Sequence, residues 1–175
     1  MEEIVVLSCT NRPNSNTLKV SKVYEDILRS KGVSVKILDF CTLPENIAFS
    51  DVFGNRSIDF AELIDSFIKN NKKFVFIVPE YNGSFPGILK LFLDCVPPSE
   101  WGNKDVCLVG VSTGRAGNLR GLDHLTGILN YLKAHVYHNK LPISAVDRIM
   151  NEHGKFISDD QINACDAQMK GFLGY

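Results

Sequence analysis

The fold class follows from residues 74–87, Phe74-Val75-Phe76-Ile77-Val78-Pro79-Glu80-Tyr81-Asn82-Gly83-Ser84-Phe85-Pro86-Gly87. The run opens with five consecutive apolar residues, which is the pattern of a short strand buried on both faces of a parallel sheet. A turn rich in Pro, Asn and Gly follows, and Pro86 suits the first turn of a helix. The stretch therefore predicts a strand, a tight loop and a helix in direct succession, which is the repeating unit of an α/β protein.

The same unit recurs along the chain. Apolar runs at residues 4–7, 33–40, 74–78 and 106–111 each precede an amphipathic stretch, and a fifth strand is expected around residues 134–137. The first two helices carry clear apolar faces, formed by Val20, Val23, Tyr24, Ile27 and Leu28 and by Phe60, Leu63, Ile64, Phe67 and Ile68. We therefore expect a parallel sheet whose two faces are both covered by helices.

Two segments fall outside this pattern. Residues 41–56, which include Pro44 and Gly54, have no helical or strand period and are expected to form a long surface loop that can help cover a ligand. Residues 141–155 are expected to be irregular. Ser158 and Gln161 resemble a capping box that opens a last helix.

Composition limits the function classes. The 175 residues, 45% hydrophobic and 22% charged, fit one domain with a real core, and the net charge of −1 without a basic cluster argues against nucleic-acid binding. No apolar run approaches the ~20 residues of a membrane span, and the acidic N-terminus does not resemble a signal peptide. We expect no membrane association.

Cysteine and histidine spacing argues against disulfides and metals. The five cysteines are odd in number, widely spaced and never arranged as C-x-x-C, which favours a reducing cytoplasm. The four histidines lie in no ligand motif, so no metal site is expected.

In an open parallel sheet, ligands bind beyond the carboxyl ends of the strands, so the loops after the first, third and fourth strands are the candidate site. The first loop, residues 9–17, leads into a helix whose N-terminal N–H groups can attract a phosphate. Its expected side-chain donors are Thr10, Arg12, Ser15, Asn16 and Thr17. The loop is equally typical of a polar turn in which Asn14 or Ser15 merely caps the helix.

This loop does not match the sequence motifs of other phosphate-binding sites. The chain contains no G-x-x-x-x-G-K-[ST] motif and no G-x-G-x-x-G after the first strand, which argues against triphosphates and tightly bound dinucleotides. Cys9 is not expected to act as a phosphatase nucleophile, because a C-x5-R cradle would need arginine at position 15, which is Ser15. Cys9 is expected to be a small structural residue.

The second and third loops suit a flat ring. Tyr81 can lie against a planar heterocycle, and backbone groups of Asn82 and Gly83 can bond the polar edge of an isoalloxazine. Residues 112–118 offer small-residue backbone for another edge of the ring. Each loop is also typical of an ordinary strand-to-helix connection, with Tyr81 at the surface or Asn118 as a cap.

With these loops in view, nearly the whole chain resembles the NADPH-dependent FMN reductase family, a flavodoxin-like group that includes chromate and quinone reductases. Residues 79–90 are similar to its P-E-Y-N-G-S-x-P-G-x-L-K signature, and residues 112–117 are similar to its small-residue loop. Arg12 and Ser15 occupy the phosphate-binding positions of its G-S-x-R-x-x-S motif, in which Cys9 and Thr10 replace the glycine and the first serine. After Asp94 the chain departs from the family, which often has a tryptophan and a basic residue there.

The resemblance implies a flavodoxin-like three-layer sandwich over residues 1–175, with five parallel strands in the order 2-1-3-4-5. It implies non-covalent FMN, NADPH or NADH as co-substrate, and electron transfer to a small acceptor such as a quinone, a free flavin, a nitro or azo compound or a metal oxyanion. The implied cofactor-binding residues are Thr10, Arg12, Ser15, Asn16, Thr17, Pro79, Glu80, Tyr81, Asn82, Gly83, Ser112, Thr113, Gly114 and Gly117. Since the cofactor carries the reaction, no catalytic side chain is expected.

Two other functions stay open: a flavodoxin-type electron carrier without nicotinamide turnover, and a binding module that has lost the cofactor. The net charge of −1 argues against the carrier, because flavodoxins tend to be strongly acidic. Residues 88–96 are apolar nearly all round the expected helix, which predicts a homodimer, or a dimer of dimers, through that helix.

Overall fold

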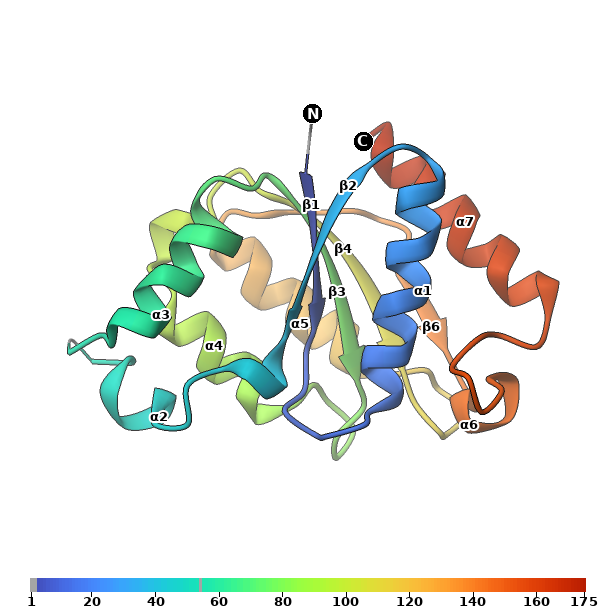
Figure 1. Cartoon of the computed structure of the whole chain (residues 1–175), viewed down its shortest axis with the longest axis horizontal. Coiled ribbons are helices and arrows are strands. Elements are labelled where there is room, and N and C mark those ends of the chain that lie inside the picture. The colour runs from blue at the N-terminus through green and yellow to red at the C-terminus, as the bar shows by residue number, and fades with distance from the viewer. Residues whose placement is uncertain (1–2, 54) are drawn as a thin grey trace.

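A central parallel sheet lies between two layers of helices (Figure 1). The computed structural model describes residues 3–53 and 55–175. The strands are β1 (Glu3–Ser8), β2 (Ser34–Asp39), β3 (Lys73–Pro79), β4 (Asp105–Val111), β5 (His135–Val136) and β6 (Leu141–Ile143). They run in the order β2-β1-β3-β4-β5, with β6 also paired to β4, and every pairing is parallel. The predicted flavodoxin-like order is confirmed.

Helices cover both faces of this sheet, as expected. One face packs against α1 (Asn16–Ser30) and α7 (Asp159–Leu173), whose apolar residues join Ile4 and Val6 of β1 in one core. The other face packs against α3 (Ile58–Leu63), α4 (Gly87–Cys95) and α5 (Leu119–Tyr131), which share a second core with Val5 and Leu7. Successive side chains of β1 therefore point to opposite faces of the sheet and pack into two separate cores. Every residue of β3 and β4 is buried, which explains why both strands are apolar after their first residues, Lys73 and Asp105.

The fifth strand position is occupied by two short strands. β5 pairs with Asp105 and Val106 at the start of β4, which confirms the strand predicted around residues 134–137. β6 pairs with Val109–Val111 at the end of β4, and a short helix, α6 (Val146–Ile149), follows it. The prediction that residues 141–155 are irregular was therefore wrong for these two elements. Pro142 concealed β6 in the sequence, since proline is tolerated only where a strand has a free edge.

The segment predicted as a long surface loop is partly structured. Phe40–Thr42 forms a 3-10 turn and Ile47–Ser50 forms α2, from which Ile47 is buried in the core beside α4. The last turn of the α3 segment, Ile64–Lys69, is a π-helix, and Pro98–Glu100 is a further 3-10 turn. Gly54, which the loop prediction included, and Met1 and Glu2 of the acidic N-terminus lie outside the described residues.

The apolar helix α4 is covered largely by its own chain. Phe92 packs against Phe40, Phe60 and Trp101, with ring centroids 4.7, 6.1 and 6.3 Å away. Leu89, Leu93 and Cys95 are buried as well. Contacts within the chain therefore account for the buried side of this helix, and Lys90 and Asp94 lie on its exposed side.

Throughout the described chain, none of the helices combines the length and the apolar character that a membrane span requires.

Candidate functional site

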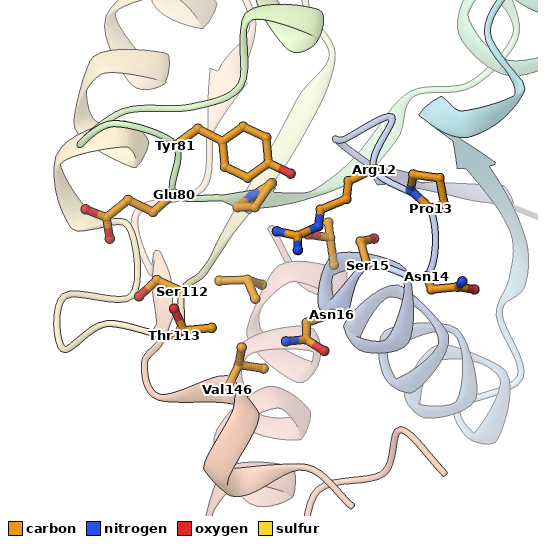
Figure 2. Close-up of a pocket in the computed structure, with 13 residues that line it drawn as sticks. Arg12, Pro13, Asn14, Ser15, Asn16, Glu80, Tyr81, Ser112, Thr113 and Val146 are labelled. Atoms are coloured by element: carbon orange, nitrogen blue, oxygen red, sulfur yellow. The ribbon is translucent and has the colours of Figure 1, made fainter. Parts of the chain in front are cut away.

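A cavity of about 470 Å³ opens at the carboxyl ends of the central strands. It lies where the loops after β1, β3 and β4 meet, because β1 and β4 flank β3 on opposite sides. Figure 2 shows side chains from all three loops, and Val146 from α6, around one space. The lining residues are Arg12, Pro13, Asn14, Ser15, Asn16, Thr17, Pro79, Glu80, Tyr81, Val111, Ser112, Thr113 and Val146.

The loop after β1 contributes the polar end of the cavity. Ser15 accepts a hydrogen bond from the Leu18 N–H at 3.1 Å, which confirms that it caps α1, and it also lines the cavity. Arg12 extends into the cavity from this loop (Figure 2). The N-terminus of α1 and one guanidinium thus face the same space, which favours an anion.

The loop after β3 is a tight hairpin. Tyr81 and Ser84 exchange two backbone hydrogen bonds of 2.9 and 3.1 Å across Asn82 and Gly83, whose φ angles are 52° and 76°. Positive φ at both central positions is the requirement of a type I′ turn, for which Asn-Gly is the preferred sequence. The turn directs the Tyr81 ring to the cavity and keeps Asn82 and Gly83 out of its lining.

A hydrogen bond joins the first two loops. The hydroxyl groups of Thr10 and Tyr81 are 2.8 Å apart, and Thr10 Oγ1 also accepts the Arg12 N–H at 3.2 Å. Thr10 is fully buried, so it acts from beneath the lining rather than within it. This side chain therefore fixes the position of Tyr81 relative to the loop that carries Arg12.

The loop after β4 is held by its own hydroxyl and by α6. Ser112 Oγ donates to the Gly114 carbonyl and accepts the Gly117 N–H, both at 3.1 Å. The backbone N–H groups of Ala145 and Val146 donate to the carbonyls of Gly114 and Ser112 at 2.9 and 3.0 Å. These bonds bring Val146 into the cavity wall, whereas Gly114 and Gly117 are not part of the lining.

The charge around the cavity favours an anionic ligand. Among the lining residues in the described chain, Glu80 is the one acidic side chain, and it points away from Arg12 in Figure 2. Its carboxylate accepts the Asn118 N–H at 3.3 Å. Asn118 in turn donates from Nδ2 to the carbonyls of Val78 and Pro79, each at 3.1 Å. Glu80 is thereby engaged with the start of α5.

Cys9 is a structural residue, as expected. Its side chain is fully buried and its thiol donates to the Leu7 carbonyl at 3.4 Å. Burial raises the pKa of Cys9 well above its ordinary value, so the group is a neutral thiol at physiological pH. Cys9 is also absent from the cavity lining, so it is not placed to act as a nucleophile there.

The structure brings most of the predicted site residues together. Nine line the cavity: Arg12, Ser15, Asn16, Thr17, Pro79, Glu80, Tyr81, Ser112 and Thr113. Thr10 supports the lining, whereas Asn82, Gly83, Gly114 and Gly117 lie outside it. Val111 and Val146 were missed, because Val111 reads as a core strand residue and Val146 reaches the site only through tertiary hydrogen bonds. Pro13 and Asn14 also line the cavity, and their position within the loop of residues 9–17 could have indicated this.

Comparison with known proteins adds independent information. The family profile described as NADPH-dependent FMN reductase matches residues 3–147. An NAD(P)H-dependent FMN reductase of Pseudomonas aeruginosa is 26% identical over 166 residues, covering 90% of this chain and 87% of the relative. A 2-hydroxy-1,4-benzoquinone reductase of a Burkholderia species is 31% identical over 109 residues, covering 54% of this chain and 60% of that protein.

Among solved structures, a flavoenzyme NAD(P)H:(acceptor) oxidoreductase of Paracoccus denitrificans superposes with a TM-score of 0.84. The alignment covers 100% of this chain and 97% of the other, at 19% sequence identity. This likeness establishes the shared fold.

Proposed function

The chain belongs to the NADPH-dependent FMN reductase family of oxidoreductases, which use FMN and a nicotinamide co-substrate, and we propose that it reduces quinones or other small electrophilic acceptors. One observation supports this proposal most directly: a cavity lies beyond the carboxyl ends of β1, β3 and β4. Arg12 and the N-terminus of α1 lie at one part of it, and Tyr81 lies at another. One ligand with a phosphate and a flat ring would use both.

The residues present fit FMN. The N-terminus of α1 offers backbone N–H donors, and Ser15, Asn16 and Thr17 add short polar side chains around them. Arg12 supplies a charge-assisted donor for a phosphate. The volume of about 470 Å³ lies in the usual range for small-ligand sites, roughly 300–1,000 Å³. The chemistry of this donor set therefore supports a bound flavin mononucleotide.

In this proposal, the side chains bind and orient. Arg12 and the start of α1 would hold the phosphate, Tyr81 would support the ring, and Ser112 and Thr113 would border it from the loop after β4. Bound FMN supplies the hydride-transfer chemistry. Tyr81 and Glu80 already have hydrogen-bond partners in Thr10 and Asn118, so neither is assigned as an acid or a base. We assign no catalytic side chain.

The acceptor class is proposed from the relatives. The Burkholderia relative is named as a benzoquinone reductase, which supports a quinone as the acceptor. Free flavins and azo compounds are further candidates, since two other relatives are named as an NAD(P)H-dependent FMN reductase and an NADPH azoreductase.

We also propose a homodimer that forms through the groove between α4 and α5. This groove is lined by Lys90, Leu93, Asp94, Pro98, His124, Gly127, Ile128, Tyr131 and Leu132. Tyr131 is 86% exposed at its edge, and the Lys90–Asp94 ion pair flanks it. A large exposed aromatic beside an apolar groove suits a self-complementary contact.

The five cysteines are all free thiols, which supports a reducing compartment such as the cytoplasm.

One measurement tests the enzymatic proposal. The visible spectrum of the purified protein, reconstituted with FMN, is recorded under anaerobic conditions before and after NADPH is added. We expect the flavin absorbance to bleach rapidly, and addition of a benzoquinone to restore it. A flavodoxin-type carrier would bind FMN without bleaching. A protein that does not bind FMN at all would favour the cofactor-less binding module.

A further inference from the structure

His124 on α5 lies against the hairpin that carries Tyr81, although it is not part of the cavity lining. Its Nδ1 shares a hydrogen bond of 2.9 Å with Ser84 Oγ. Its ring also packs on Phe85, with centroids 4.9 Å apart. Both contacts come from residues of the loop after β3, so His124 is attached to the end of the hairpin at two points.

The contacts continue from Ser84 to the cavity. Ser84 exchanges two backbone hydrogen bonds with Tyr81, and Tyr81 lines the cavity. The far end of the Tyr81 side chain is held by Thr10 at 2.8 Å. Tyr81 is therefore fixed at its hydroxyl by the first loop and at its backbone by a turn that His124 holds in place.

The first two turns of α5 are shaped to receive this hairpin. Asn118, Gly121 and His124 are spaced by three residues and so share one helix face. Asn118 holds the carbonyls of Val78 and Pro79, and a Cβ on Gly121 would lie 2.8 Å from the backbone of Ser84. The helix thus approaches Ser84 at its backbone, and His124 completes the contact one turn further on.

We propose that His124 is a positioning residue of the cavity, which sets the place of Tyr81 by holding Ser84. This inference rests on the proposed function, because it takes the ligand beside Tyr81 to be FMN. His124 does not touch that ligand. Its effect passes through the Ser84 hydroxyl and the Tyr81–Ser84 turn.

The test is a mutant cycle read by FMN binding to the full-length protein. His124→Phe keeps a ring against Phe85 but removes the nitrogen, and Ser84→Ala removes the other partner. Each is expected to weaken FMN affinity by roughly fivefold, the effect of losing one hydrogen bond. The double variant is expected to be no weaker than either single one, because both remove the same bond.

Three further measurements separate positioning from general stability. His124→Asn places an amide near the former Nδ1 and is expected to restore affinity and the absorbance maxima of the bound flavin to wild-type values. Asp123→Ala, on the same turn but paired with Lys140 at 2.7 Å, is the matched control and is expected to bind FMN as wild type does. Sedimentation of each variant checks that its assembly state is unchanged.

The outcomes are distinct. Wild-type affinity in both His124→Phe and Ser84→Ala, or additive losses in the double variant, would overturn the positioning role. Equal losses in Asp123→Ala and His124→Phe would do the same. If the wild-type protein itself binds no FMN, the proposed function fails instead. Ser84→Ala removes one hydroxyl at a half-buried position, so its own FMN affinity still tests the contact if His124→Phe folds poorly.

Discussion

The hydroxyl groups of Thr10 and Tyr81 lie 2.8 Å apart and hydrogen-bond the loop after β1 to the loop after β3. Thr10 is fully buried, whereas the Tyr81 ring reaches the cavity lining, so the bond links the interior of the protein to the candidate site. This pair gives the convergence of the two loops a specific physical basis. It also gives the first prediction.

Tyr81→Phe is expected to weaken FMN binding by roughly three- to tenfold, because the ring remains but its anchor to Thr10 is lost. Thr10→Val removes the same bond from the other side and should give a comparable loss. Thr10→Ser, which keeps the hydroxyl, is the control. Fluorescence titration of FMN measures all three, and a Tyr81→Phe protein that binds FMN as tightly as wild type would show that the bond does not position the ring.

Arg12→Ala is expected to weaken FMN binding by about 10- to 100-fold while leaving riboflavin binding nearly unchanged, because riboflavin lacks the phosphate. The difference between the two ligands isolates the charge-assisted contact. Arg29→Ala, at the opposite end of α1 and paired with Glu25 on the surface, is the control. Parallel losses for FMN and riboflavin would place Arg12 away from the phosphate.

Gly117→Ala is expected to destabilise the fold by about 2 to 4 kcal/mol. Gly117 has a φ of +55°, and a Cβ there would lie 2.6 Å from Pro142 Cβ and 2.9 Å from the Ile143 nitrogen in β6. Gly114→Ala is the matched control in the same loop, since its nearest neighbour would be 3.9 Å away and its φ is not in the left-handed region. Urea unfolding compares the two, and equal midpoints would contradict the close packing of this loop on β6.

The environment of the Asp51 carboxylate leads us to expect that the stability of the fold falls in acid. Burial alone would raise the pKa of Asp51, but hydrogen bonds from the backbone and hydroxyl of Ser57 and from Ser50, with the nearby Arg56 charge, outweigh it and lower the pKa. A carboxyl whose pKa is lower in the folded state stabilises the protein above its unfolded pKa of ~3.9, and that stabilisation is lost as the pH falls through the folded value.

Asp51→Asn is therefore expected to lower stability at pH 7 and to flatten the decline of stability below about pH 5 relative to wild type. Unfolding free energies measured across the acid range test this. Asp59→Asn, on an exposed part of α3, is the control. Identical acid profiles for wild type and Asp51→Asn would exclude the proposed linkage.

Tyr131→Asp is expected to convert a dimer into a monomer, because it places a charge at the edge of the α4/α5 groove. The side chain is 86% exposed, so the fold itself should persist. Sedimentation velocity at micromolar concentration measures the change. If the wild-type protein is itself a monomer, the proposal that this groove forms a dimer contact is wrong.

Most of the fold was predictable because buried strands and helix faces produce recognisable patterns of apolar residues in the local sequence. Consecutive apolar residues in β3 and β4 indicated strands covered on both faces, and the spacing of Val20, Tyr24 and Ile27 indicated the buried face of α1. The two short elements β6 and α6 were not predictable in this way. Three residues with a central Pro142 form a strand only because the end of β4 offers them a free edge.

The sequence alone determined which loops form the candidate site, since parallel strands place their carboxyl ends on one side and the motif around Tyr81 indicated the family. Only the tertiary structure decided which members of those loops face the cavity. Gly117 packs on β6 instead, Asn82 and Gly83 form the tip of a turn, and Val146 arrives from a remote helix. The physical reason is that residue type and spacing encode local conformation and burial, whereas the direction of a loop side chain depends on hydrogen bonds with segments far away in the chain.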